Sequence, residues 1–322
     1  MTSATDDQNT PATEAILVID IGGTNVKFGY SCGGQPLDFR KLYSTDALRA
    51  GDPVRALALM IEDVVADTGI EAQSLVVAVP GFIDTDGNSV LHAANVPSLN
   101  GRRLGAELEQ WFGCPALLER DAVLTLMGER RAGVVQGGDD VLGVFFGTGV
   151  GAAFIHHGAP FRGGGWALEI GLMPFQAEGP VPDGVRPQCL EAFASGRALQ
   201  AIAGRHGVAI DSVFLASRYK PSLEDELARF VQYQAVAIGT ASAMMSPATI
   251  VVGGGVVDMA GYPRDRLASL IESKLPNAET GRAFDLRWCR HGWTAALYGA
   301  PVIVGERRLQ VADAGRRGYL WP

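Results

Sequence analysis

Three apolar runs along the chain each end in a glycine-rich turn. The runs and their turns occupy residues 15–21 with Gly22 and Gly23, 140–146 with 147–151, and 249–252 with 253–255. Continuous apolar runs of this length, rich in β-branched side chains, are typical of buried β-strands. Strand-like residues 26–30 and 152–156 follow the first two turns. Each of these two turns is therefore predicted to join two strands rather than a strand and a helix.

Apolar spacing between these runs predicts helices and further strands. Residues 52–69 carry apolar side chains at helical spacing and end at a glycine. The sequence Ser222-Leu223-Glu224-Asp225 predicts a capping box that opens a long helix ending near Met245. Further helices are predicted over 101–112, 121–131 and 294–309, and further strands over 36–43, 74–79 and 115–119. This order of elements predicts a mixed α/β fold whose first strands are antiparallel.

The strand, glycine turn and second strand occur twice, about one domain apart, which indicates a duplication. A chain of 322 residues is also long for a single core. We therefore predict two similar α/β lobes that face each other across a cleft. The expected division is a disordered leader over 1–14, an N-terminal lobe over 15–120, a C-terminal lobe over 121–300, and a C-terminal helix and tail over 301–322 that returns to the first lobe. Residues 84–100 are too long and polar for a simple connection, so they are predicted to carry a binding loop.

Composition narrows the class of protein. The net charge of −8 provides no positive surface for nucleic acid or an anionic membrane, so phosphorylated ligands must be held by local donors and metal. No apolar run is long enough to span a bilayer, and the polar start of the chain lacks the basic and apolar regions of a signal peptide. The four cysteines lack the spacing of a zinc site or a disulfide framework; they are Cys32, Cys114, Cys189 and Cys289. A cytoplasmic protein with reduced thiols is expected.

The glycine turns were weighed against three common motifs. Gly147-x-Gly149-x-x-Ala152 matches the dinucleotide fingerprint, but a strand follows it and no matching acidic strand end is present. A P-loop is disfavoured because its glycines open a helix. An ordinary glycine hairpin accounts for one turn, but not for three turns at the carboxyl ends of buried strands. If the three turns converge, they form a cradle for a phosphate and a nucleoside.

Polar side chains beside the first turn suit a phosphate and its metal. Thr24, Asn25 and Lys27 supply donors of the kind that a phosphate needs. Asp20 stands at the end of the buried strand and is the candidate metal ligand. Phosphoryl transfer asks mainly for a metal that neutralises charge, donors on the phosphates and a base near the acceptor hydroxyl.

Three further carboxylates are candidates for the acceptor side of that chemistry. Asp121 stands where a strand meets a helix, and it serves either as a general base or as the N-cap of the helix. Glu169 and Glu191 lie among apolar and glycine neighbours. Each of them either accepts hydrogen bonds from a polyol or pairs with an arginine.

Over residues 16–300 these motifs resemble those of the ROK sugar kinases, members of the fold group that includes hexokinase, the heat-shock ATPases and actin. The corresponding segments are 20–27 for the first phosphate motif, 147–151 for the second, 250–256 for the adenosine motif, 119–122 for the Asn-Asp-Ala segment, 167–171 for the Ala-Gly-Glu-Ile-Gly signature, and 189–191 for the end of the sugar-binding region. The resemblance implies an α/β fold with two actin-like (ribonuclease H-like) lobes around an interlobe cleft.

The resemblance also implies an activity, the ATP-dependent phosphorylation of a hexose at O6. Asp121 is then the catalytic base, and Asp20 holds Mg²⁺. The sugar-binding residues expected are Gly81, Asn95, Arg120, Asp121, Glu169 and Glu191. The nucleotide-binding residues expected are Gly22, Gly23, Thr24, Asn25, Lys27, Gly147, Thr148, Gly149, Gly254 and Gly255.

The chain departs from the family pattern in three ways. Leu172 replaces the histidine of a zinc cluster that many members carry, and that histidine also touches the sugar. Of the three cysteines of that cluster only Cys189 has a counterpart, so no structural zinc is expected. Arg120 replaces a sugar-binding asparagine, as it does in allose kinases, which the chain also resembles at 253–259. Arg120 either donates to a sugar hydroxyl or forms a salt bridge with Glu119, Glu129 or Glu169.

Other interpretations stay open at this point. A sugar-responsive regulator of the same fold needs a DNA-binding helix-turn-helix, which a leader of 14 residues on an acidic chain cannot supply. A sugar-binding protein without kinase activity and a kinase that uses polyphosphate are the alternatives. Allose or a glucose-like sugar is favoured as the acceptor, and a homodimer is the commonest expectation for the assembly.

Overall fold

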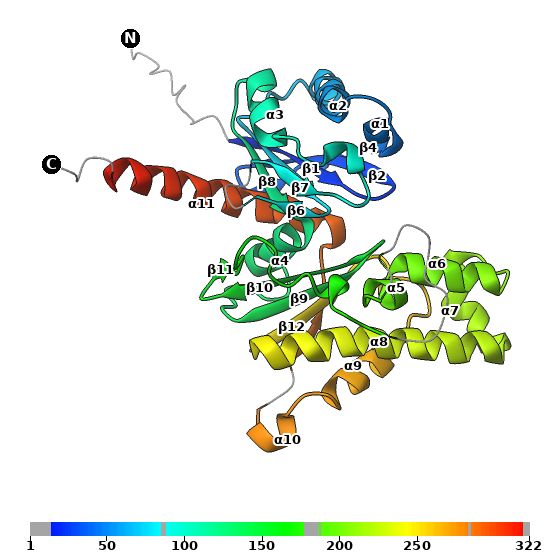
Figure 1. Cartoon of the computed structure of the whole chain (residues 1–322). Coiled ribbons are helices and arrows are strands. Elements are labelled where there is room, and N and C mark those ends of the chain that lie inside the picture. The colour runs from blue at the N-terminus through cyan, green and yellow to red at the C-terminus, as the bar shows by residue number, and fades with distance from the viewer. Residues whose placement is uncertain (1–13, 85–87, 177–185, 187, 283–284, 318–322) are drawn as a thin grey trace, which may run out of the picture. The chain divides into compact units, whose positions relative to one another are not determined.

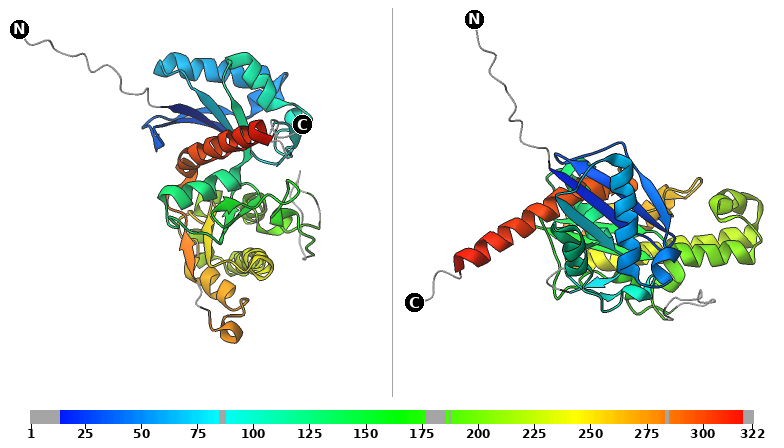
Figure 2. Two further views of the ribbon diagram at one scale, coloured as in Figure 1. Left: turned by 90° about the vertical axis from the view of Figure 1, so that its left-hand side faces the viewer. Right: turned by 90° about the horizontal axis from the view of Figure 1, so that it is seen from above.

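The structure is a computed structural model, drawn in Figures 1 and 2. It describes residues 14–84, 88–176, 186, 188–282 and 285–317, so the predicted leader lies outside the described residues except for Glu14. Contacts divide the chain into two compact units. The first comprises Met1–Glu119 with Ala300–Pro322, and the second comprises Arg120–Gly299.

The first unit is built on a sheet with the strand order β3-β2-β1-β5-β8, in which β4 also pairs with β2. Its strands are β1 (Ala15–Ile21), β2 (Asn25–Cys32), β3 (Gln35–Pro36), β4 (Lys41–Ser44), β5 (Ser74–Val79) and β8 (Ala116–Arg120). Strand β1 runs antiparallel to β2 and parallel to β5. Every residue of β1 except Asp20 is buried. The predicted pairing of two strands across the first glycine turn is confirmed.

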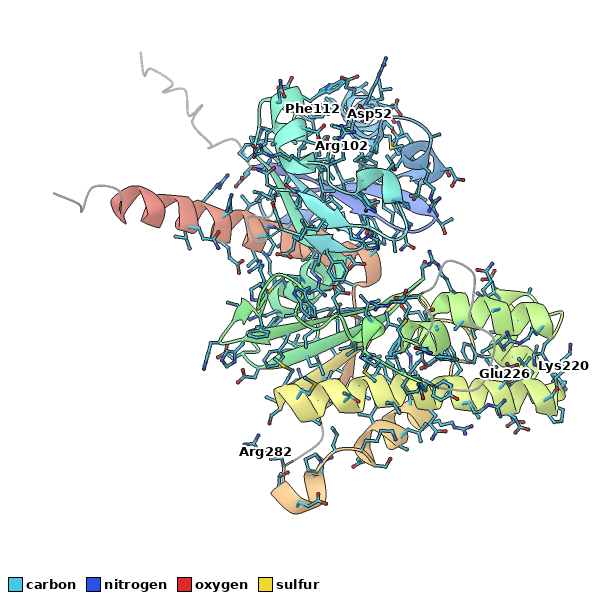
Figure 3. The ribbon with its side chains drawn as sticks, in the orientation of Figure 1. Asp52, Arg102, Phe112, Lys220, Glu226 and Arg282 are labelled. Atoms are coloured by element: carbon cyan, nitrogen blue, oxygen red, sulfur yellow. The ribbon has the colours of Figure 1, made fainter. Side chains whose placement is uncertain are left out.

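Before residue 120, the described part of this unit contains the helices α1 (Asp46–Arg49), α2 (Pro53–Thr68) and α3 (Leu104–Phe112). Helices α2 and α3 contact each other on one face of the sheet (Figure 1). The carboxylate of Asp52, at the start of α2 in Figure 3, accepts the N–H groups of Val54 and Arg55 at 3.0 and 3.4 Å. Gly69 ends the helix in the left-handed conformation. The helix predicted over 52–69 is confirmed at both ends.

The segment over 84–100, which was predicted to carry a binding loop, contains one short strand and one short helix among its described residues. Strand β7 (Val90–His92) pairs antiparallel with β6 (Phe82–Ile83), which precedes the segment, in a separate two-stranded sheet. The short 3-10 helix η1 (Pro97–Leu99) follows.

The second unit repeats the strand order of the first. Its sheet has the order β11-β10-β9-β12-β13. The strands are β9 (Val141–Phe146), β10 (Val150–His156), β11 (Ala159–Pro160), β12 (Thr249–Gly253) and β13 (Leu286–Trp288). Strand β9 runs antiparallel to β10 and parallel to β12, just as β1 does with β2 and β5. The prediction of a mixed α/β fold with two similar halves is confirmed.

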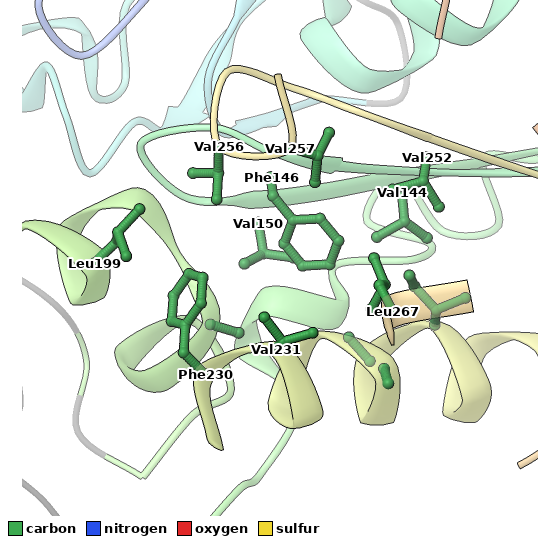
Figure 4. Close-up of a cluster of buried hydrophobic side chains, with 14 of the residues drawn as sticks. Val144, Phe146, Val150, Leu199, Phe230, Val231, Val252, Val256, Val257 and Leu267 are labelled. Carbon is green, nitrogen blue, oxygen red and sulfur yellow. The ribbon is translucent and has the colours of Figure 1, made fainter. Parts of the chain in front are cut away.

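Helices cover both faces of the second sheet. The described helices of this unit are α4 (Asp121–Ala132), α5 (Glu191–Ala194), α6 (Gly196–Arg205), α7 (Val213–Ala216), α8 (Pro221–Met245), α9 (Arg264–Glu272) and α10 (Asn277–Thr280), with the 3-10 turns η2 (Ile170–Leu172), η3 (Ile210–Ser212), η4 (Ser217–Tyr219) and η5 (Gly292–Thr294). Helices α4 and α8 lie on opposite faces (Figures 1 and 2). Beneath the sheet, Phe146 packs in one buried cluster with Phe230 and Val231 of α8 and Leu267 of α9 (Figure 4).

The last helix, α11 (Ala295–Arg317), begins in the second unit, and its residues from Ala300 onward belong to the first. It contains Pro301. None of the helices in the described ranges combines the length and the apolar character that a membrane span requires.

Several element boundaries differ from the sequence prediction; for example, the helix expected over 294–309 is α11 and continues to Arg317. The helix expected from residue 101 begins at Leu104, because Gly101 has a left-handed φ of +74° that a helix cannot include. The strand expected over 36–43 is interrupted at 37–40, and its two parts, β3 and β4, both pair with β2. The capping box at Ser222 is wrong: α8 begins one residue earlier, at Pro221, which suits the first helical position because it has no N–H group.

Candidate active site

The first glycine turn is closed by its own backbone. The N–H of Gly22 donates to the carbonyl of Asn25 at 2.9 Å. A Cβ atom on Gly22 would lie 2.9 Å from that carbonyl oxygen, closer than side chains come in folded proteins. Glycine is therefore required at this position because of close approach, and neither Gly22 nor Gly23 has a positive φ.

Asp20 and Lys27 form an ion pair beside this turn. They face each other across β1 and β2, with Lys27 Nζ 2.7 Å from Asp20 Oδ2. Their side chains are 17% and 27% exposed, so both heads reach the surface of the first unit. A carboxylate oxygen at such a position is a ligand of the kind that a hard cation such as Mg²⁺ binds.

The single carboxylate of Asp20 suits Mg²⁺ that is bound together with a nucleotide. No group of three or more His, Cys, Asp or Glu side chains is arranged to hold a metal within the described ranges. Mg²⁺ in phosphoryl-transfer sites is usually held by one or two carboxylates together with substrate phosphates and water. Asp20 fits a cation that arrives with a nucleotide, rather than one held in a closed protein site.

The segment around Asn95 is joined to the first turn by an arginine that the sequence analysis missed. Arg49 Nε donates to the carbonyl of Asn95 at 3.0 Å, and Arg49 Nη2 donates to the carbonyl of Gly23 at 2.6 Å. Gly81 packs against the end of β7, since a Cβ atom on Gly81 would lie 2.1 Å from the carbonyl oxygen of His92. No sequence motif marks Arg49, because its partners are backbone atoms far away along the chain.

In the second unit, two of the glycine turns lie at one end of the sheet. The carbonyl of Phe146, the last residue of β9, accepts the N–H of Val256 at 3.0 Å. Gly254 has a φ of +100°, and a Cβ atom on it would lie 2.5 Å from the same carbonyl oxygen. The carbonyl of Gly147 accepts the N–H of Gly196 at 2.8 Å, at the start of α6. Thr148 and Gly255 lie within these two turns.

Glu191 touches the second glycine turn directly. Its Oε2 accepts the N–H of Val150 at 2.9 Å. A Cβ atom added to Gly149 would lie 2.4 Å from Oε2, and one added to Gly171 would lie 3.2 Å from it. The turn is therefore shaped to admit this carboxylate, which comes from α5, about 40 residues further along the chain.

Arg120, at the end of β8, is 5% exposed and is occupied by partners from two other segments. Its guanidinium donates to the carbonyl of Ala152 at 3.0 Å and to the carbonyl of Ala167 at 2.6 Å. It also pairs with Glu169 Oε1 at 2.7 Å. Of the three salt bridges that the sequence left open for Arg120, the one to Glu169 is present.

The backbone between two of these contacts is strained. Leu168 has a left-handed φ of +62°, which costs a residue with a side chain roughly 1–2 kcal/mol. Arg120 binds the residue before it and the residue after it, Ala167 and Glu169. The arginine thereby holds the strained segment in place.

Burial raises the pKa of Glu169 from its ordinary value of 4.5 to about 7. Arg120 acts in the opposite direction, while the nearby carboxylates of Asp121 and Glu191 raise the pKa further. Glu169 therefore changes its charge near neutral pH. It does so in a group of charged residues that also contains Arg120, Asp121 and Glu191.

Replacing Glu169 by Gln should change how stability depends on pH. The folded protein binds an extra proton between pH values of about 4.5 and about 7, so the contribution of Glu169 is fully present below that range and is lost as pH rises through it. We expect the free energy of unfolding to fall over this interval in the wild type, and less so in E169Q. Urea unfolding at about pH 5 and about pH 8 measures the difference. Glu272→Gln, on the exposed side of α9, is the matched control, and equal pH slopes in E169Q and the wild type would contradict the assignment.

Asp121 is the first residue of α4, and Arg120 occupies the N-cap position. Asp121 is exposed, and its Oδ1 accepts the N–H of Ala122 at 2.7 Å. A Cβ atom on Gly151 would lie 3.9 Å from Oδ1, which places Asp121 beside the second glycine turn.

Residues 16–307 match the ROK family. The chain belongs to the ROK family. An N-acetyl-D-glucosamine kinase of Pectobacterium carotovorum is 23% identical over 301 residues, which cover 88% of this chain and 97% of that protein. A ROK hexokinase from Thermus thermophilus is 26% identical, with a TM-score of 0.71 over 89% of this chain and 96% of that one. A ROK family glucokinase from Streptomyces griseus, solved with glucose and AMPPNP, is 24% identical, with a TM-score of 0.73 over 89% and 97% of the two chains.

The family match and the solved structures place the chain in the ROK family and give it the fold that ROK sugar kinases have. The relatives named above are kinases of N-acetyl-D-glucosamine, of hexose and of glucose. None of these three relatives is named an allose kinase.

One buried acid of this ROK protein has a structural role. Glu129 is fully buried in α4, and its Oε1 accepts the N–H groups of Arg290 and His291 at 2.9 Å each. Its Oε2 accepts the N–H of Val134 at 3.0 Å. The two bonds from Oε1 hold the segment that leads into α11, and the bond from Oε2 holds the residues just after α4. Glu129 therefore joins the end of α4 to a segment about 160 residues further along the chain.

Proposed function

We propose that this ROK protein transfers the γ-phosphoryl group of ATP to a hexose, at O6. The observation that carries the proposal is the position of Asp121, an exposed carboxylate at the start of α4, beside the glycine turn that Glu191 also touches. Phosphoryl transfer to an alcohol needs such a base within reach of both the hydroxyl and the loops that hold the phosphates. The kinase names of the relatives support the same activity.

In this proposal the second unit supplies the base and part of the sugar site. Asp121 accepts the proton of the attacking hydroxyl. Glu169 and Glu191 accept hydrogen bonds from other hydroxyls, since a half-buried carboxylate gains most from donors that replace water. Arg120 acts on the sugar through Glu169, because its guanidinium already serves two carbonyls and that carboxylate.

The remaining roles concern the nucleotide and the rest of the sugar. The backbone of the glycine turns and the side chains of Thr24, Asn25, Thr148 and Lys27 bind the phosphates. Asn95 and Gly81 complete the sugar site. Asp20 holds Mg²⁺, which offsets the negative charge of the transferring phosphoryl group when it is bound. Exclusion of water from the reacting groups prevents hydrolysis of ATP.

The acceptor sugar is proposed as a glucose-like hexose, either glucose or its C3 epimer allose. The chain lacks the histidine that touches the sugar in zinc-containing members, since Leu172 stands there. The replacement removes one polar contact, and Arg120 provides a positive charge that those members do not have. Single hydroxyl differences of this kind are read by paired hydrogen bonds, because an unpaired buried polar group costs binding energy.

Release of ADP by the purified chain tests the proposal. We expect turnover with ATP and Mg²⁺ on at least one sugar in a panel of glucose, allose, mannose, N-acetylglucosamine and N-acetylmannosamine, and faster turnover with ATP than with polyphosphate. Glucose binding in calorimetry without phosphorylation of any sugar, from ATP or from polyphosphate, would contradict the kinase assignment and would favour a sugar-binding protein. Faster turnover with polyphosphate would keep the kinase but replace the donor.

A further inference from the structure

The first glycine turn has a feature that its sequence does not show: the carbonyl groups of residues 22–24 are bound by α1 and by Thr45, the residue before it. The carbonyl of Gly22 accepts the hydroxyl of Thr45 at 2.8 Å, and the carbonyl of Thr24 accepts the N–H of Thr45 at 3.0 Å. The carbonyl of Gly23 between them accepts Arg49 Nη2 at 2.6 Å. Three consecutive peptide units are thus oriented by two residues.

This orientation has a direct consequence for the N–H groups. In a trans peptide unit the C=O and N–H bonds point in opposite directions. Because the carbonyls of residues 22–24 point toward Thr45 and Arg49, the N–H groups of residues 23–25 point away from them. Successive N–H groups on one side of a turn form a concave site for an anion. The glycines permit this shape, while Thr45 and Arg49 hold it.

Arg49 also reaches the segment assigned to the sugar. Its Nε donates to the carbonyl of Asn95 at 3.0 Å, and Nη1 pairs with Asp46 one helical turn earlier. The same segment is held a second time, since the hydroxyl of Ser98 donates to the carbonyl of Leu48 at 2.6 Å. One planar guanidinium therefore joins the glycine turn and the Asn95 loop, and its side chain is 35% exposed.

We propose that Arg49 is a positioning residue that couples the glycine turn to the Asn95 loop, so that a ligand on either one orders the other. The proposal rests on the proposed function in one respect only, the assignment of phosphate to the turn and of sugar to the loop. Arg49 does not touch a reacting atom in this scheme. It acts by fixing the carbonyls of Gly23 and Asn95 relative to each other.

Lysine at this position is the informative substitution. Arg49→Lys keeps the positive charge but has one ammonium group in place of a rigid fork of donors, so it cannot serve Gly23, Asn95 and Asp46 together. Arg55→Lys, on the exposed side of α2, is the matched control. Asp46→Asn is a second variant that keeps the arginine and removes the carboxylate that orients it.

Hydrogen exchange of the full chain gives the readout. Without ligand, we expect the amides of residues 22–26 and 93–96 to exchange about tenfold faster or more in R49K than in the wild type, at both segments together, and less so in D46N. With AMPPNP the wild type should gain protection at both segments, and with glucose likewise. In R49K the protection from AMPPNP should be confined to the turn, and that from glucose to the loop. R55K should match the wild type throughout.

The turnover measurement separates coupling from simple stability. We expect kcat/KM of R49K to fall about tenfold or more, with KM rising for ATP and for the sugar together, while the melting temperature stays within about 2 °C of the wild type. The proposal would be overturned if hydrogen exchange at the two segments were unchanged in R49K and D46N. It would also be overturned if AMPPNP or glucose protected both segments in R49K as it does in the wild type. Absence of turnover in the wild type would instead contradict the proposed function, and the ligand-free exchange comparison would still decide the coupling.

Discussion

Replacing Asp121 by Asn should lower kcat by a factor of about 10² or more, while the affinity for the sugar stays within about threefold of the wild type. The amide keeps the shape of the side chain and an oxygen that can accept the N–H of Ala122, so α4 begins at the same residue. What is lost is the ability to accept a proton from the attacking hydroxyl. ADP release and calorimetric titration with the same sugar measure the two quantities.

The matched control for this variant is Asp225→Asn. Asp225 is also an exposed aspartate near the start of a helix, α8, but it lies outside the proposed site. We expect D225N to turn over at the wild-type rate. Near-normal turnover by D121N would show that a different group takes the proton, and it would leave the sugar site without its assigned base.

The second large effect is expected from Gly149→Ala, through Glu191. The new Cβ atom would lie 2.4 Å from Glu191 Oε2 and 3.1 Å from its Cδ, so the carboxylate must move. A side-chain end can swing away at little cost to the fold, whereas its hydrogen bond with the N–H of Val150 is lost. Because a charge-assisted hydrogen bond is worth about 1.5–3 kcal/mol, we expect sugar binding to weaken about tenfold or more.

Gly147→Ala provides the comparison within the same turn. A Cβ atom on Gly147 meets nothing within 4 Å, and its φ is not left-handed. We therefore expect G147A to bind the sugar as the wild type does in calorimetry without nucleotide, while G149A does not. Equal weakening in both variants would mean that the backbone of the turn matters, rather than the position of Glu191. A melting curve of each variant checks that the fold survives.

The two predictions separate the parts of the proposed site. D121N tests the chemical step and leaves sugar binding in place, whereas G149A tests a sugar contact through a residue that does not itself touch sugar. The pH dependence of stability tests a third feature, the ionisation of Glu169 beside Arg120. Agreement of all three would support one site around α4, the second glycine turn and α5 in the second unit.

Much of the candidate site could be predicted from the sequence because its parts are local. A buried run that ends in glycines is a strand and a tight turn, whatever surrounds it. Asp20 and Lys27 could be placed beside such a turn for that reason, and their ion pair follows from the antiparallel pairing of β1 and β2. Motif order then assigned roles to Asp121, Glu169 and Glu191, and the structure brings these three together within the second unit.

Contacts between distant segments could not be predicted, because each depends on how elements pack. The sequence left three partners open for Arg120, and packing selected Glu169. Arg49 carries no motif, since its partners at Gly23 and Asn95 are carbonyl groups that every residue has. The same reason hid the structural role of Glu129, whose partners are N–H groups of residues 134, 290 and 291.

The sequence by itself determined the strands beside the glycine turns, the longer helices and the identity of the chemical groups, because hydrophobic period, glycine and capping residues act within a few residues of where they stand. The helix over 52–69 shows this, with Asp52 and Gly69 marking its ends. The sequence did not predict the shorter helices α5, α6, α7, α9 and α10. Only the tertiary structure decided which carbonyl groups the charged side chains of Arg49 and Arg120 bind. It also decided the pKa of Glu169, since burial and pairing are properties of packed segments. The strained backbone at Leu168 and the raised pKa of Glu169 arise in that way.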